Sequence, residues 1–205
     1  RHSNYFFQNS GYGLKKGEWV YQNRYLYLSE FEVGLSDRFS MGLGFIPFVA
    51  IFDGEGAFPY YLRANYSLPL QEDELQWNLS GFYLDAIGDE SSGSGFVSTG
   101  LTFGRKESHL GVSIGYGVAN GEVSSTPTLS INGLAEVSTR TSLIGESFFF
   151  TSDDTLSGIA ILGARSATSR RLATAIDYGM LLVFAEGDLV GVPYFGLRIP
   201  LSKKI

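Results

Sequence analysis

The sequence predicts an all-β fold: an up-and-down antiparallel transmembrane β-barrel of about ten to twelve strands. Two observations carry this prediction. Apolar side chains alternate with small ones in nearly every stretch of ten residues, and the second face is built from Gly, Ser, Asn and Thr rather than from Lys and Glu. A period of two indicates a strand whose two faces meet different environments. A second face with little charge is typical of strands that cross a membrane as a closed barrel.

Eleven stretches have the alternation and the length of roughly 9 to 11 residues that a tilted membrane strand needs. We expect strands near 24–35, 39–51, 58–68, 75–86, 95–104, 109–119, 128–138, 142–151, 155–165, 171–184 and 188–201. The stretch 142–151 fits least well, because Glu146 falls in phase with Ile144 and Phe148. Single-chain bacterial barrels have an even number of strands, so an earlier strand is required.

Tyr5–Leu14 is the candidate for this earlier strand, which brings the count to about twelve. The alternative for the N-terminal segment 1–17 is a position in the lumen or at the rim of the barrel. In either case we expect residues 1–205 to form a single barrel domain.

The connections between the expected strands have two lengths over the first two thirds of the chain, whereas all links after residue 150 are short. The short polar turns are Ser36–Arg38, Arg105–Ser108 and Thr139–Thr141, and the longer links are 53–57, 88–94 and 120–127. Short turns at one rim and longer loops at the other are typical of outer-membrane barrels, whose short turns face the periplasm. We therefore expect Ser36–Arg38 to lie at the periplasmic rim.

Composition excludes several classes of protein. The net charge of −6 argues against a nucleic-acid partner, because the phosphate backbone attracts basic proteins. The chain has no cysteine, which excludes disulfides and thiolate chemistry. No apolar run approaches the roughly 18 to 20 residues of a spanning helix. No signal peptide is visible at Arg1, so an exported protein would have lost that segment before this residue.

A soluble β-barrel that binds an apolar ligand is the main structural alternative. Its outer face would need Lys and Glu along the strands, whereas the charges here gather in turns such as Ser36–Arg38 and Arg105–Ser108. Aromatic residues also lie near the expected strand ends, as in the girdles of membrane barrels. The residues concerned are Tyr25, Tyr27, Tyr60, Tyr61, Tyr83, Phe96, Phe148, Phe149, Phe150, Tyr194 and Phe195.

The chain resembles a Gram-negative outer-membrane β-barrel protein of an uncharacterised family of small barrels. Asn4–Phe7, Leu14–Glu18 and Tyr21–Asn23 carry the resemblance. It implies an integral protein of the bacterial outer membrane and supplies no catalytic residue. One departure is the C-terminus, Leu201–Ile205, because such barrels often end on an aromatic residue that the insertion machinery reads.

If the apolar faces point to lipid, the opposite faces point into the lumen. The lipid-facing candidates are Leu43, Phe45, Tyr60, Tyr66, Ile114, Tyr116, Tyr178 and Leu182. The candidates for polar or ion-paired lumen residues are Glu30, Glu32, Arg63, Asn65, Gln76, Asn78, Glu136, Arg171, Asp177 and Arg198. Buried charges are tolerated when they are paired. The lumen set therefore forms either an ion-paired filling of a narrow barrel or a polar pore with a charged constriction.

The sequence offers little for catalysis. A hydrolase would need a nucleophile beside a base, and the chain has two histidines, His2 and His109. His109 and Ser113 share a face but lie about 13 Å apart on a strand, so a serine from a neighbouring strand would be needed. The simpler interpretation is that His109 lies where a turn ends and a strand begins. We expect no enzyme, no cofactor and no metal site, since neither cysteine nor paired histidine is present.

Two acidic stretches, Gln71–Glu74 and 53–55, are solvated turns or, alternatively, contacts to lipopolysaccharide through a divalent cation. The expected partners are outer-membrane lipid, lipopolysaccharide and other envelope proteins. The leading functional hypothesis is a structural or interaction role, as an accessory subunit or a small barrel with surface loops. The alternative is a passive channel for small polar solutes.

Overall fold

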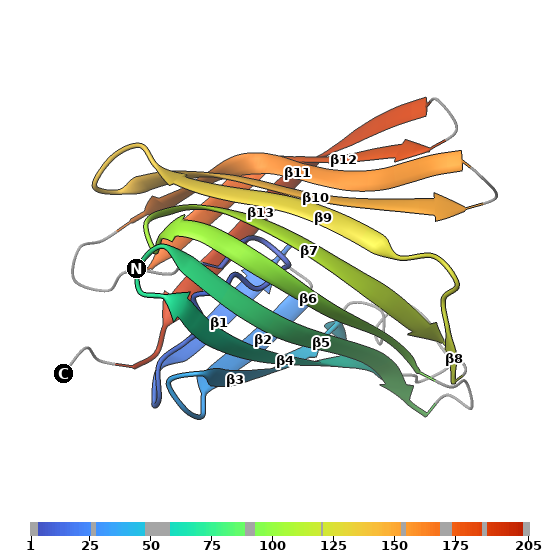
Figure 1. The fold of residues 1–205 in the computed structure, drawn as a ribbon, viewed down its shortest axis with the longest axis horizontal. Helices are drawn as coiled ribbons and strands as arrows, with labels where there is room; N and C mark the ends of the chain where they lie inside the picture. Colours follow the sequence, from blue (N-terminus) through green and yellow to red (C-terminus); the bar gives the residue numbers. More distant parts are fainter. Residues whose placement is uncertain are drawn as a thin grey trace.

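The computed structural model describes residues 4–25, 28–47, 58–88, 93–119, 121–152, 155–168, 174–185 and 188–202. Thirteen strands make up most of these residues (Figure 1). They are β1 Trp19–Arg24, β2 Leu28–Gly34, β3 Phe39–Phe45, β4 Phe58–Gln71, β5 Leu75–Ile87, β6 Ser94–Arg105, β7 Ser108–Ala119, β8 Glu122–Val123, β9 Thr128–Glu136, β10 Thr141–Ser152, β11 Thr155–Ala167, β12 Ala175–Ala185 and β13 Asp188–Pro200.

The strands close into an antiparallel barrel. Each pairs with the next along the chain, except that β7 pairs with β9 and carries the two-residue β8 at its end. β1 pairs with β13, with Gln22 opposite Arg198, and this pairing closes the sheet. The described chain therefore forms a closed barrel of twelve strands plus β8. The predicted fold class is confirmed, and closure leaves no unpaired sheet edge.

The first strand is not where the sequence predicted it. Tyr5–Leu14 forms no strand, and β1 lies instead at Trp19–Arg24. The expected strand 24–35 is β2, because the chain turns at Tyr25, whose φ of 54° is left-handed. β1 was missed because its outward residues include the polar Asn23 beside Tyr21, so its alternation is weak.

The connections differ in length between the two rims as expected only up to about residue 150, because β10 ends at Ser152 just before β11 begins at Thr155, whereas β11 ends at Ala167 well before β12 begins at Ala175. The turns at 35–38, 72–74, 106–107 and 137–140 lie at the rim where β1 begins and β13 ends, which we call the terminal rim. The opposite rim, which we call the loop rim, is where β5 ends and β6 begins and where β7 ends and β9 begins. The two rims are the two ends of the barrel in Figure 1.

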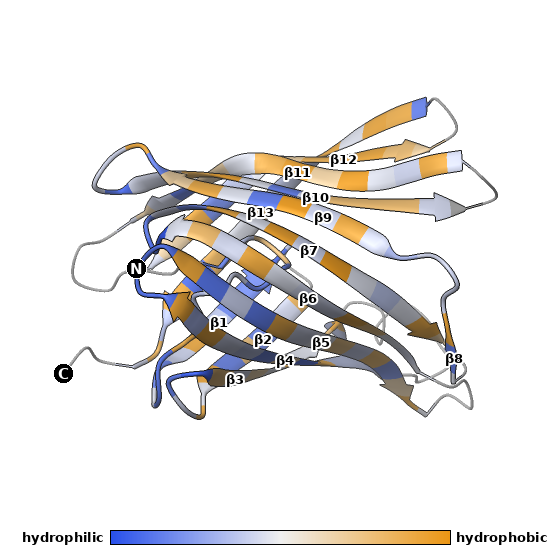
Figure 2. Ribbon diagram, in the orientation of Figure 1, coloured by the Kyte–Doolittle hydropathy of each residue, from blue (hydrophilic) through white to orange (hydrophobic). Residues whose placement is uncertain are grey.

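The outer face of the barrel is mostly apolar. On β7, Leu110, Ile114 and Tyr116 are exposed, while His109 is buried on the inner face. Figure 2 shows this alternation of hydrophobic and hydrophilic residues on neighbouring strands. Soluble monomers rarely expose contiguous apolar patches of more than a few hundred Å². An apolar belt around a closed barrel is the surface that hydrocarbon solvates, so the barrel spans a membrane.

Most buried side chains lie inside the barrel, around the N-terminal segment. The largest buried apolar cluster joins Tyr5 and Phe6 to residues of four strands: Leu134, Ile144, Ile161 and Tyr194. The N-terminal segment is thus part of the packed interior of the barrel.

Candidate functional site

Residues 4–14, which we call the plug, lie inside the barrel. Asn4 and Tyr5 contact Arg165 near the terminal rim, and Gln8 reaches Ser113 at mid-height on β7. The chain then returns: the Gly11 N–H donates to Thr102 Oγ1 at 2.9 Å, and the Gly17 N–H donates to the Gly34 carbonyl at 2.8 Å. The plug therefore enters from the terminal rim, turns at about half the depth of the barrel and leaves by the same rim.

The turn of the plug is bonded to β10 through Glu146. One carboxylate oxygen accepts the Phe7 N–H at 2.8 Å, and the other accepts the Gln8 N–H at 2.5 Å. Glu146 is fully buried on the inner face, in phase with the buried Ile144. A carboxylate that accepts two backbone N–H groups makes charge-assisted hydrogen bonds, which are about twice as strong as neutral ones.

The Gln8 side chain joins the plug to β7 and β9. Its amide nitrogen donates to Ser113 Oγ at 2.7 Å. Its carbonyl oxygen accepts hydrogen bonds from Ser130 Oγ, at 2.9 Å, and from Asn132. These bonds satisfy both polar ends of a buried amide, which would otherwise cost free energy.

Aromatic contacts fill the space around these bonds. The Phe6 ring packs on Tyr194 with centroids 4.7 Å apart, and Tyr5 packs on His109 at 5.3 Å. The Arg24 guanidinium lies 5.2 Å from the centroid of the Phe7 ring, which is cation–π distance. Arg24 Nε also donates to the Phe6 carbonyl at 2.6 Å. The plug therefore contacts the barrel wall through both packing and polar bonds.

Charged side chains in the lumen balance one another. In the described chain four arginines and four carboxylates are buried: Arg24, Arg63, Arg165, Arg198, Glu30, Glu32, Glu146 and Asp177. Glu30 accepts from Arg24 at 2.8 Å, from Arg63 at 3.2 Å and from the Tyr61 hydroxyl at 3.1 Å. Arg63 Nη2 donates to the plug at Asn9 Oδ1, at 2.8 Å.

A second ion pair lies nearer the terminal rim. Arg165 and Asp177 form two parallel bonds of 2.7 and 2.8 Å, and Arg165 Nη1 also donates to the Asn4 carbonyl at 2.7 Å. Arg198 and Glu32 lie farther apart, with 3.9 Å between Nη2 and Oε2. Each of the two ion-pair groups therefore contacts the plug: the Glu30 group through Asn9, and the Arg165–Asp177 pair through Asn4.

The other predicted lumen residues are placed as follows. Asn65, Gln76 and Asn78 are buried on the inner face, and Ser80 Oγ donates to Asn65 Oδ1 at 2.8 Å. Glu136 is half-buried at the end of β9, by the terminal rim. Arg171 lies outside the described residues.

The predicted lipid-facing residues lie on the outer side of the alternation. Five of them are exposed: Leu43, Tyr66, Ile114, Tyr116 and Tyr178. The other three are half-buried by their neighbours: Phe45, Tyr60 and Leu182.

His109 packs between two plug tyrosines. Its ring lies 5.3 Å from the Tyr5 ring and 5.4 Å from the Tyr12 ring, and its Nδ1 lies 3.1 Å from the Arg105 carbonyl oxygen. The Tyr12 hydroxyl in turn donates to the Gly104 carbonyl. These contacts place His109 in the packing between the plug and the β6–β7 turn. His2 lies outside the described residues.

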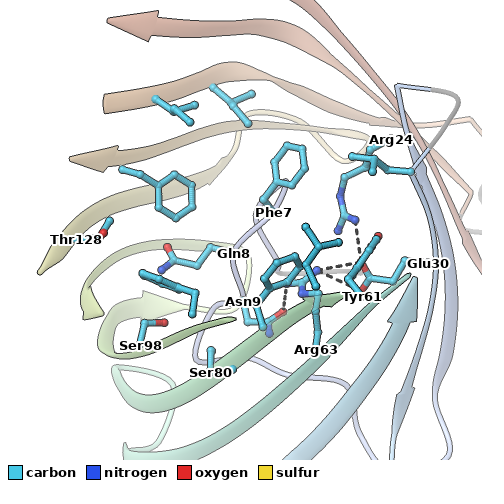
Figure 3. Close-up of a pocket in the computed structure, with 18 of the residues that line it drawn as sticks. Phe7, Gln8, Asn9, Arg24, Glu30, Tyr61, Arg63, Ser80, Ser98 and Thr128 are labelled. Atoms are coloured by element: carbon cyan, nitrogen blue, oxygen red, sulfur yellow. Dashed lines mark hydrogen bonds and ion pairs between the residues drawn. The ribbon is translucent and has the colours of Figure 1, made fainter. Parts of the chain in front are cut away.

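A cavity of about 520 Å³ lies beyond the tip of the plug, toward the loop rim (Figure 3). We call it the chamber. Its floor is formed by Phe7, Gln8, Asn9, Arg24, Glu30 and Arg63. Its walls are mostly apolar: Leu28, Ile46, Phe82, Leu84, Phe96, Phe148, Phe150, Ile159, Ile161 and Leu181, with Tyr61, Ser80, Ser98 and Thr128 among them.

The chamber corrects one sequence prediction. Phe96, Phe148 and Phe150 were expected in a girdle at the membrane interface, but they line the chamber. Tyr61 and Tyr194 are likewise buried inside the barrel. Alternation alone separates the two faces of a strand but does not show which face points into the barrel. An aromatic residue near a strand end fits either face. The apolar inner wall was therefore not predictable from composition.

Three charged residues of the interior were also missed: Arg24, Glu146 and Arg165. Arg24 was expected to start a strand rather than end one. The phase of Glu146 with Ile144 was the available signal, because a carboxylate on the apolar face of a strand indicates that this face points inward. Arg165 shares the inner face with the buried Ile161, which is the same signal.

The described residues contain no group of three or more His, Cys, Asp or Glu side chains arranged to bind a metal. Among these residues there is also no helix long and apolar enough to cross a membrane.

Comparisons with known proteins find distant similarity among solved structures only. No protein family model matches the chain, and no curated protein matches it. Among solved structures, the outer membrane channel DcaP of Acinetobacter baumannii is similar with a TM-score of 0.39 and 9% sequence identity. The alignment covers 84% of this chain and 62% of the channel, so the chain spans less than two thirds of that protein's length.

Proposed function

We propose that the protein is an integral outer-membrane barrel with a structural or interaction role, and that its own N-terminal segment closes the lumen. The double bond from Glu146 to the backbone of Phe7 and Gln8 is the observation that carries the proposal. It joins the plug to the wall at mid-height, and the balanced arginines and carboxylates surround it. A lumen filled in this way favours a closed barrel over an open pore.

In the proposed orientation the terminal rim faces the periplasm and the loop rim faces outward, following the short-turn rule for outer-membrane barrels. The chamber then opens toward the cell exterior. The acidic turn Gln71–Glu74 lies at the terminal rim, on the side away from lipopolysaccharide. Contacts with lipopolysaccharide are therefore expected from the apolar belt and the loop rim, and contacts with envelope proteins from either rim.

A passive channel is the second candidate. The chamber favours it, because beyond the plug the lumen is hollow. The plug also forms no β-pairing with the wall, so it is attached by side-chain and single backbone bonds. A channel would require the plug to leave.

Planar-bilayer recordings test the two candidates. The intact chain should show no current steps, whereas a variant that lacks residues 4–13 should show steady ion-conducting steps. The deletion must first show the heat-modifiable gel migration of a folded barrel. Steady steps from the intact chain would contradict the closed-lumen proposal and favour the channel.

A further inference from the structure

The chamber combines mostly apolar walls with a charged floor, which is unusual for the interior of a membrane barrel. The lumen of such barrels is normally polar. Here Phe82, Phe96 and Phe148 point into it from three strands, and Phe82 is 38% exposed although it lies on the inner face. Apolar side chains left facing a hollow space lose free energy that an apolar ligand would recover, at about 25 cal/mol per Å² removed from water.

The floor of the chamber is charged. Arg24 and Arg63 share Glu30, and Figure 3 shows these three groups beside Asn9 at one end of the cavity. Of the charged groups that line the chamber, two are therefore cationic and one is anionic. Glu146 is occupied by the backbone of Phe7 and Gln8 and does not line the chamber. A guanidinium has five N–H donors, so Arg24 and Arg63 keep donors for an anionic group besides those that bind Glu30, Phe6 and Asn9.

The size of the chamber fits a small molecule. Its volume of about 520 Å³ lies within the range of roughly 300–1,000 Å³ that is usual for ligand pockets. It is lined by mostly apolar walls with a few polar groups, and its charged groups are gathered at one end. The floor is made by the tip of the plug, so a ligand could enter from the loop rim without displacing residues 4–14.

We propose that the chamber binds a single-chain amphipath with an anionic headgroup, such as a long-chain carboxylate. The hydrocarbon chain lies against Phe82, Phe96 and Phe148. The headgroup points to Arg24 and Arg63. This inference rests on the plug as part of the proposed function, because Phe7, Gln8 and Asn9 supply the floor.

Native mass spectrometry of the detergent-purified protein tests the proposal, with dodecanoate and dodecan-1-ol as probes of equal chain length. Dodecanoate should form a one-to-one adduct, and dodecanol should bind at least about tenfold more weakly, as expected for loss of a charge-assisted hydrogen bond. Equal binding of the two probes, or no dodecanoate adduct, would overturn the proposal.

Two substitutions locate the site. Thr128 lines the chamber, whereas its neighbour Leu129 is exposed on the outer face. Thr128→Trp should fill the chamber and abolish the dodecanoate adduct, while Leu129→Trp should leave it unchanged. Arg63→Gln should weaken dodecanoate binding about tenfold and leave dodecanol binding unchanged. Retention of the adduct in Thr128→Trp would contradict the proposed site.

Bilayer recordings on the same samples separate the two proposals. Dodecanoate binding together with steady conductance would sink the closed-lumen function and leave the binding site standing. A barrel that shows neither conductance nor a dodecanoate adduct would overturn the binding site and leave the closed-lumen function standing.

Discussion

Glu146 Oε1 accepts the backbone N–H of Gln8 at 2.5 Å, across 138 residues of sequence. The same carboxylate accepts the N–H of Phe7, so one side chain of the wall satisfies two donors at the turn of the plug. Backbone donors inside a barrel must find partners, because water is scarce there. This relationship makes the position of the plug depend on a residue of β10.

Replacing Glu146 should loosen the plug without opening the sheet. Glu146→Gln removes the charge and points an amide N–H₂ at one of the two backbone donors. A hydrogen bond to a charged group contributes about 1.5–3 kcal/mol, so amide exchange at Phe7 and Gln8 should accelerate by about tenfold or more. Hydrogen exchange measured by mass spectrometry gives this rate.

The matched control is Glu122→Gln on β8, where the side chain is exposed. It should leave exchange in the plug unchanged. Unaltered protection of Phe7 and Gln8 in Glu146→Gln would show that the carboxylate is not an anchor.

Breaking the bidentate ion pair should destabilise the whole barrel. Asp177→Ala leaves Arg165 buried without its carboxylate, with hydrogen bonds to the carbonyls of Asn4 and Tyr5. Removing one member of a buried pair costs about 3–5 kcal/mol. Urea unfolding in lipid vesicles should show a loss of this size, whereas Asp188→Ala, at an exposed position, should change the free energy of unfolding little. Equal stability of the two variants would argue against the pair.

A methyl group at Gly34 should displace residues 14–18, the segment by which the chain leaves the barrel and which we call the neck of the plug. An added Cβ would lie 2.0 Å from the Lys15 carbonyl oxygen. The two backbone segments are held together at this point, because the Gly34 carbonyl accepts the Gly17 N–H and the Gly34 N–H donates to the Glu18 carbonyl. Gly34→Ala should therefore increase protease cleavage within residues 14–18. Gly81→Ala is the control, since a Cβ there meets nothing within 4 Å. Resistance equal to that of the control would mean that the neck lies elsewhere.

A charge on the outer face should impair insertion in a depth-dependent way. Ile114 is exposed at the middle of β7, and Leu35 is exposed at the terminal rim. Arginine costs about 2–4 kcal/mol at the bilayer midplane and about 0–1 near the interface. Ile114→Arg should therefore lower folding yield into vesicles far more than Leu35→Arg. Equal yields would place water, not hydrocarbon, around Ile114.

The sequence predicted the barrel well because the alternation that indicates each strand is a local pattern. Eleven expected strands correspond to β2–β7 and β9–β13, and the faces of residues such as Leu43 and Ile114 follow from alternation alone. Strand ends were less predictable: β3 ends at Phe45, and β12 begins at Ala175.

The interior was less predictable because it depends on distant pairings. Nothing local in Asn4–Leu14 indicates that Glu146, Thr102 and Arg165 would be its partners. The segment is rich in aromatics, which are common in strands, and only tertiary contacts exclude that interpretation. The apolar chamber was hidden for a related reason, since Phe148 and Phe150 fit an outer girdle as well as an inner wall.

Disulfide trapping in native membranes tests the central claim most directly. The protein has no cysteine, so a new pair reports without background. A Cβ at Gly13 would lie 3.4 Å from Ser67 Oγ, within reach of a disulfide. The pair Gly13→Cys with Ser67→Cys should cross-link nearly completely under mild oxidation, and Gly13→Cys with Tyr66→Cys, on the outer face, should not. Failure of the first pair, or equal cross-linking of both, would contradict a plug inside the barrel.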